Sequence, residues 1–144
     1  MQADTQTAQD SGVAKIRALL LAARPGLAAD ARELAAEFKQ KHAPGEPIPN
    51  RSSAITVLIE KMKTLREAVE AVAVEGAAPV SARDLTVRAL LEIEQSLGKL
   101  AESYAAPDQA SSTSLLAEST RLLKEARTTS TKAGKALGIP WPLQ

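Results

Sequence analysis

Apolar side chains recur every three or four residues over long stretches of this chain, a spacing that places them on one face of an α-helix. The longest unbroken run has spacings of 3-4-3-4-3 and consists of Ile55, Leu58, Met62, Leu65, Val69 and Val72. A second run, spaced 3-4-3-4, consists of Leu90, Ile93, Leu97, Leu100 and Tyr104. Stripes of this length predict helices that pack lengthwise against one another.

The apolar composition points the same way. Alanine contributes 28 residues and leucine 18, and these are among the strongest helix formers. Residues that favour strands are scarce by comparison, with only three aromatic side chains in 144 residues. We therefore expect an all-α fold in a single domain, and the alanine content suits a bacterial or phage origin.

The expected architecture is an antiparallel up-down helical bundle with three long helices at about 52–75, 82–105 and 109–137. A shorter N-terminal helical pair is expected at about 12–24 and 27–42, because Pro25 and Gly26 interrupt the pattern between them. Gly76 is the expected end of the first long helix. Ser81 with Asp84 resembles a capping box for the next one.

The ends of the chain are assigned by composition. Residues 1–11 are polar without a helical period and predict a disordered tail, so 12–137 form the bundle domain and 138–144 a Pro/Trp C-terminal tail. The apolar pattern of the last helix weakens over residues 128–138, where small and β-branched residues bury little area. We therefore expect that end of the helix to fray.

Reactive side chains are few. The chain has no cysteine and one histidine, His42, which excludes thiolate chemistry and metal sites with two histidines. Glu94 lies beside a seam and is the one weak candidate for a carboxylate metal site, although a solvated or helix-paired glutamate is the simpler interpretation. We expect no enzyme activity, no catalytic residue, no metal, no cofactor and no small-molecule substrate.

A DNA-binding alternative rests on residues 27–66, where two helices flank a proline-rich connector in helix-turn-helix order. Segment 11–66 has ten basic and five acidic residues, whereas 67–106 has three basic and seven acidic ones. The basic part could meet DNA or the acidic part of the same bundle. The side chains that would contact nucleic acid are Asn50, Arg51, Ser52, Thr56, Lys63 and Arg66. The connector is longer than the 3–4 residues of a tight helix-turn-helix, so we favour an elbow between bundle helices.

The C-terminal tail carries the only tryptophan, Trp141, between two prolines. It has two interpretations: the indole packs against the end of the bundle, or Trp141, Ile139 and Leu143 form an exposed peptide that a partner binds. We expect a cytoplasmic, non-enzymatic adaptor, assembly factor or secretion-related factor, without excluding non-classical export. Its partner is another protein or a second copy of the chain, with nucleic acid as the alternative and no membrane.

Overall fold

A computed structural model describes residues 2–39 and 51–143, with side chains described at 11–34 and 55–143. Over these residues the chain forms four helices and no strand, so the predicted all-helical fold is confirmed. The helices are α1 (Gln2–Lys39), α2 (Arg51–Glu70), α3 (Ala77–Ala105) and α4 (Gln109–Leu137). None of them combines the length and the apolar character that a membrane span requires.

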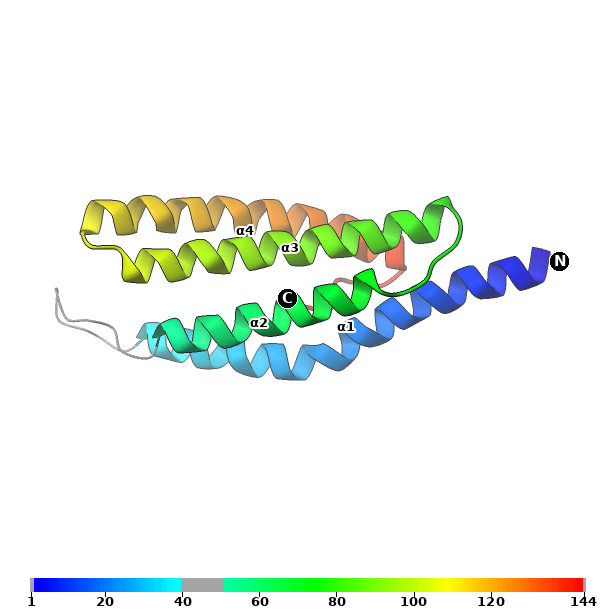
Figure 1. Cartoon of the computed structure of the whole chain (residues 1–144), viewed down its shortest axis with the longest axis horizontal. Coiled ribbons are helices and arrows are strands. Elements are labelled where there is room, and N and C mark those ends of the chain that lie inside the picture. Colours follow the sequence, from blue (N-terminus) through cyan, green and yellow to red (C-terminus); the bar gives the residue numbers. More distant parts are fainter. Residues whose placement is uncertain (1, 40–50, 144) are drawn as a thin grey trace.

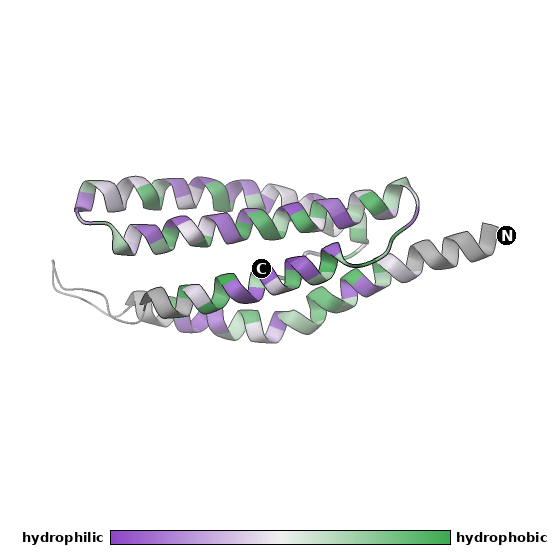
Figure 2. Ribbon diagram, in the orientation of Figure 1, coloured by the Kyte–Doolittle hydropathy of each residue, from purple (hydrophilic) through white to green (hydrophobic). Residues whose placement is uncertain are grey.

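The helices associate as two hairpins. Helix α1 lies beside α2, and α3 lies beside α4, with consecutive helices running in opposite directions (Figure 1). Helix α2 joins the hairpins by packing on α3, and α1 also contacts α3. Hydrophobic and hydrophilic bands alternate along the coloured part of each helix in Figure 2, as expected of amphipathic helices. Helix α4 packs mainly on α3, so much of its surface does not contact the other helices.

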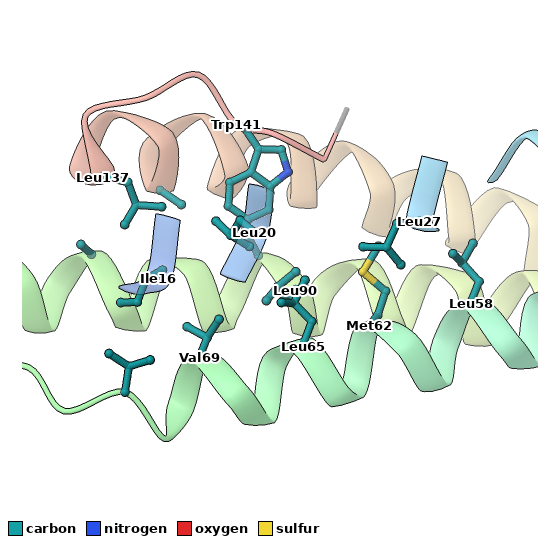
Figure 3. Packing of buried hydrophobic residues seen from close by; sticks show 14 of the residues in the cluster. Ile16, Leu20, Leu27, Leu58, Met62, Leu65, Val69, Leu90, Leu137 and Trp141 are labelled. Atoms are coloured by element: carbon teal, nitrogen blue, oxygen red, sulfur yellow. The ribbon is translucent and has the colours of Figure 1, made fainter. Parts of the chain in front are cut away.

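The core lies between α1, α2 and α3 and continues to the end of α4 and the tail through Ala133, Leu137 and Trp141. All six apolar residues of the predicted 55–72 seam are buried, which confirms that stripe. Of the second predicted stripe only Leu90 is fully buried, and Ile93, Leu97, Leu100 and Tyr104 are half-buried against the same cluster. Figure 3 shows Leu20 and Ile16 of α1 facing Leu65 and Val69 of α2 across this core. The half-buried end of α3 therefore borders a part of the bundle that no helix fully covers.

Helix α1 corrects the prediction of a helical pair at 12–24 and 27–42, because one helix runs through Pro25. A proline inside a helix removes one hydrogen bond and costs about 3 kcal/mol. Here the proline lies on an exposed face, while Leu20 before it and Leu27 and Leu34 after it are buried. Each buried leucine contributes about 1.5–3 kcal/mol, so packing on both sides outweighs the break.

The same helix begins at Gln2, where the composition predicts a disordered tail over residues 1–11. Residues 2–11 carry no apolar stripe, so their helical state comes from the packed segment that follows. Extending an existing helix fixes one residue for each added hydrogen bond, whereas starting a helix fixes several for one. A polar segment can therefore continue a helix that it could not nucleate.

The junction between α2 and α3 also differs from the prediction. Helix α2 ends at Glu70 rather than near residue 75, and α3 begins at Ala77 rather than at 82. Gly76 starts α3 as its N-cap with a φ of 94°, and Ser81 and Asp84 lie inside the helix instead of capping it. Pro79 fits the first turn, where an N–H has no intrahelical acceptor. Gly12 of α1 approaches this junction closely: an added Cβ would lie 2.8 Å from the Ala73 carbonyl oxygen.

Helix α4 has the bounds that the sequence predicts, 109–137. The Asp108 carboxylate accepts a hydrogen bond from the Ser111 N–H at 2.7 Å, which caps the start of the helix. At the other end Gly138 adopts the left-handed conformation. The N–H of Ile139 reaches the Gly134 carbonyl at 3.0 Å, and the N–H of Gly138 reaches that of Lys135 at 3.2 Å. These two bonds form a Schellman cap, which turns the chain back on itself.

The cap at Asp108 makes the stability of the protein pH-dependent. The backbone and hydroxyl hydrogen bonds from Ser111 lower the pKa of Asp108 below its ordinary value of 3.8. A carboxylate whose folded pKa is depressed stabilises the fold above its unfolded pKa and loses that contribution as the pH falls through the folded pKa. We expect Asp108→Asn to be less stable than the wild type at about pH 7, with the difference shrinking below about pH 3. Urea unfolding at both pH values measures it, and an equal difference at both would contradict the assignment.

The interface between α3 and α4 is rich in small and hydroxyl side chains. The Ser96 hydroxyl donates to the Ser119 carbonyl oxygen at 2.9 Å, and the Ser119 hydroxyl donates to the Ser96 carbonyl oxygen at 2.7 Å. Such short side chains reach the backbone of the facing helix only where the two helices approach closely. The buried positions of α4 continue this character to its end and are Ser119, Ala126, Thr129, Ser130, Ala133, Gly134 and Leu137. The expectation that this end frays is therefore wrong.

Candidate functional site

The C-terminal tail, residues 138–143, folds back along the bundle after the cap at Gly138. Its end lies near the middle of the molecule rather than beyond α4 (Figure 1). The Trp141 side chain points toward Leu20 of α1 (Figure 3) and is only 7% exposed. Pro142 is buried, while Ile139 and Leu143 are half-buried. Of the two interpretations left open by the sequence, this structure has the first: the indole of Trp141 packs against the bundle.

The tail lies close against α4, and the end of α4 from which it leaves is bonded to α1. An added Cβ at Gly134 would lie 2.8 Å from the Ile139 carbonyl oxygen and 3.0 Å from the Trp141 backbone nitrogen. Only glycine therefore lets the tail backbone lie this close to α4. From α1, the guanidinium of Arg17 donates a hydrogen bond to the Leu137 carbonyl oxygen at 3.1 Å. That carbonyl belongs to the end of α4, where a cation is favoured.

A groove of about 580 Å³ lies between the tail, α4 and α3, and we call it the α4 groove. Its apolar lining comes from all three elements, with Leu123 and Ala126 on α4, Ile93 on α3, and Trp141 and Leu143 on the tail. Its polar lining comes from α4 alone and consists of Arg127, Ser130 and Thr131. The described lining residues include no carboxylate.

The apolar surface of the groove continues along α4 beyond the tail. Leu116, Leu123, Arg127 and Gly134 are spaced 7-4-7, so they share one side of the helix. The tail covers this side at Gly134, but Leu116 is 46% exposed and Leu123 38% exposed. From Leu116 to Thr131 the side extends about 22 Å at the helical rise of 1.5 Å per residue. It is thus an elongated surface rather than a closed pocket.

Cations border this surface. Lys124, Arg127 and Lys135 are exposed side chains on one stripe of α4, with Thr131 between the last two. On the opposite side of the tail, Arg24 of α1 lines a smaller cavity of about 180 Å³ together with Pro142 and Leu143. Among the described residues, none of these four cations forms an ion pair, whereas Arg121 on another face of α4 pairs with Glu125 at 2.8 Å.

A second hollow of about 550 Å³ lies between α1 and α2 beside Gly26. Leu19, Leu27 and Leu65 contribute to its lining, together with the alkyl stem of Lys61. The Lys61 ammonium lies 2.5 Å from Asp30, which ties α2 to α1 at this position. This hollow lies where Gly26 contributes no side chain, and one of its two charged lining residues, Lys61, is paired with Asp30 outside it.

The ionisable groups buried between the helices form structural pairs. Glu94, considered above as a metal ligand, is 10% exposed and bonds to Arg66 of α2 at 2.5 Å. The hydrogen bond to Glu94 raises the pKa of Arg66, which also contacts Glu70 at 3.0 Å. Glu92 accepts a hydrogen bond from Thr129 at 2.8 Å across the α3–α4 interface. Within the described residues no group of three or more histidine, cysteine, aspartate or glutamate side chains could hold a metal ion.

The residues of the DNA-binding alternative do not form one surface in the part of the chain that the structure describes. Arg66 is bound to two glutamates, and Lys63 and Thr56 are exposed on α2. Arg51 and Ser52 lie in the first turn of α2, with side chains outside the described set, and Asn50 and His42 lie outside the described residues. Helix α2 packs lengthwise between α1 and α3 instead of projecting as a groove-reading helix does.

The sequence did not identify the α4 groove, although two signals for it were present. Leu116 and Leu123 follow Leu115 and Leu122 directly, so the apolar stripe of α4 is wider than one helix contact needs. Lys124, Arg127 and Lys135 share one face without acidic residues at the intervening helical contacts. The part contributed by the tail could not be seen, because it depends on where residues 139–143 fold.

Comparisons with known proteins identify no relative: no family model, no curated protein and no solved structure matches the chain.

Proposed function

We propose that this chain is a non-enzymatic helical adaptor or assembly factor that works by binding another protein through the α4 groove. The proposal includes the up-down arrangement of the bundle, in which α4 is the outermost helix. It also includes a second copy of the chain as one form that the partner can take.

The observation that supports this proposal is the exposed leucine pair on the outer helix. Leu116 and Leu123 are large apolar side chains that face solvent in line with a groove lined by Trp141 and Leu143. Exposed apolar residues that adjoin a groove are typical of protein-binding surfaces, whereas isolated ones are common everywhere. The buried ionisable groups are occupied in structural pairs, so the surface offers recognition rather than reactive chemistry.

Protein binding is favoured over DNA binding by the state of the basic side chains in residues 27–66. Arg66 and Lys61 are already paired with Glu94 and Asp30, so they offer little charge to phosphate. The exposed Lys63 adjoins α2 residues of mixed sign, including Glu60 and Glu67. Interleaved charges of this kind suit a solvated helix face better than a phosphate track.

The test is affinity capture from an extract of the source organism with the wild type and with a Leu116→Lys, Leu123→Lys variant. Both positions are exposed, so the variant should keep its helical circular dichroism while losing the apolar surface. We expect it to retain less than about a tenth of the wild-type capture of the specific partner, the effect of losing two central apolar contacts. Light scattering of the purified protein shows whether that partner is a second copy.

The matched control is Val57→Lys, the same kind of change at an exposed apolar residue of α2. Val57 lies outside the α4 groove, so this variant should capture the partner as the wild type does. Equal capture by the wild type and the double lysine variant would contradict a role for the groove. Binding of duplex DNA that survives both variants and weakens with Lys63→Ala would favour the alternative function instead.

A further inference from the structure

We propose that the α4 groove binds an acidic amphipathic helix, with leucine-like side chains on its apolar face and carboxylates along one edge. This inference rests on the proposed function and adds the chemistry of the partner. Three features carry it: the shape of the apolar floor, the charge along its rim, and the way in which the tail closes one end.

The floor of the groove fits a helix rather than an isolated side chain. Leu123 lines the groove, and the exposed Leu116 lies seven residues, two helical turns, before it on the same side of α4. Ile93, Trp141 and Leu143 extend the apolar lining toward the tail. A surface about 22 Å long matches about 15 residues of a bound helix. An amphipathic helix in a groove places its apolar side chains at such intervals of three, four and seven residues.

The rim of the groove sets the charge of the partner. Arg127 lines the groove, and Lys124 and Lys135 are exposed beside it on the same stripe of α4. Arg24 lines the smaller cavity, which shares Ile93 and Leu143 with the groove, and no described carboxylate is among the lining residues of either. Helix α4 as a whole has five basic and two acidic residues. Both of those acids, Glu118 and Glu125, contact Arg121 and lie away from the groove. Carboxylates on a partner would therefore meet cations that have no ion-pair partner among the described residues.

The apolar floor distinguishes a peptide from a nucleic acid. A phosphate backbone would use the cations but leave Leu116 and Leu123 in contact with solvent or with polar groups. A helix with both an apolar face and an acidic edge covers the leucines and pairs the cations at once. The tail closes the end of the groove at Gly134, so the partner would approach from the side of Leu116.

The experiment uses the full chain and a labelled peptide of about 18 residues, with leucine and glutamate at helical spacing and no tryptophan. Fluorescence anisotropy of the label gives the affinity at about 50 mM salt and again at about 500 mM. Trp141 is the only tryptophan and lines the groove, so its emission reports binding at this place. We expect both signals to change with one binding curve, and the affinity to fall as salt rises.

Charge reversal tests the rim. Lys124→Glu with Arg127→Glu should weaken the acidic peptide at least about tenfold and should let a peptide with lysine in place of glutamate bind. The matched control is Lys63→Glu with Lys132→Glu, which gives the same net charge. Lys132 lies about 140° around α4 from Arg127, and Lys63 is on α2, so this variant should bind the acidic peptide as the wild type does.

Three results would overturn the proposal. The acidic peptide could fail to bind the wild type at millimolar concentration, or it could bind both charge variants equally. Duplex DNA could bind with dependence on Lys124 and Arg127 while the peptide does not. If the peptide fails but capture still depends on Leu116 and Leu123, the groove binds a protein of other chemistry and only this inference is lost. If capture is independent of the leucines, the proposed function fails regardless of the peptide.

Discussion

Replacing Trp141 with alanine should lower the free energy of unfolding by about 3 kcal/mol, the low end of the range for a buried tryptophan. The indole is almost completely buried between the tail, α1 and α4. The loss stays near the low end because the tail is a short segment outside the four helices. Once its anchor is gone the tail can leave the bundle, and its residues regain about 1–2 kcal/mol each of backbone entropy.

Urea unfolding followed by far-ultraviolet circular dichroism measures this change without relying on tryptophan fluorescence. Trp141→Phe keeps an aromatic anchor and should lose less than half as much. Leu116→Ala removes an exposed side chain and should stay within about 0.5 kcal/mol of the wild type. A Trp141→Ala protein that matched the Leu116→Ala protein would show that the tail contributes nothing to the core.

Replacing Gly134 with alanine should destabilise the protein by about 1–2 kcal/mol although alanine is the better helix former. Inside a helix, glycine to alanine normally gains about 1 kcal/mol. At Gly134 the new methyl group would lie 2.8 Å from the Ile139 carbonyl oxygen and 3.0 Å from the Trp141 backbone nitrogen. Those atoms belong to the backbone of the tail, so the clash is relieved only by moving the tail off α4.

Gly98→Ala is the matched control, because Gly98 also lies inside a helix and an added Cβ there would meet nothing within 4 Å. We expect this variant to gain about 0.5–1 kcal/mol, so the two glycine substitutions should differ in sign. In Gly134→Ala the emission of Trp141 should also shift to longer wavelength as the indole becomes exposed. A gain in stability at both positions would contradict the close packing of the tail.

The residues whose environment is local were predicted best. Asp108 and Gly138 mark the ends of α4 by their own conformations and hydrogen bonds, and these bounds were correct. The seam from Ile55 to Val72 was correct because a stripe at helical spacing has one way to be buried. Prediction failed at Pro25 and at Gly76. A proline can end a helix or lie within one, and a glycine can end one helix or precede the next. Packing partners distant in sequence decide such cases.

The α4 groove also depends on packing partners that are distant in sequence. Its leucines and cations can be read along α4, but its other wall is Trp141 and Leu143 of the tail together with Ile93 of α3. The late part of α4 seemed too poor in leucine to pack, yet its small side chains are what let the tail and α3 approach it closely. The weak apolar pattern at the end of α4 thus corresponds to a close contact. That contact can be recognised only when the position of the tail and of α3 is known.

The sequence by itself determined that this protein is helical, where its longest apolar stripe lies and where α4 begins and ends. Helix propensity, spacing and capping act between residues close in the chain, so a reader of the sequence has both partners of each interaction in view. Only the tertiary structure decided that α1 continues through Pro25, that Gly76 opens α3, and that the tail returns to form a wall of the groove. These outcomes depend on apolar burial between segments far apart in sequence, whose free energy outweighs local preferences.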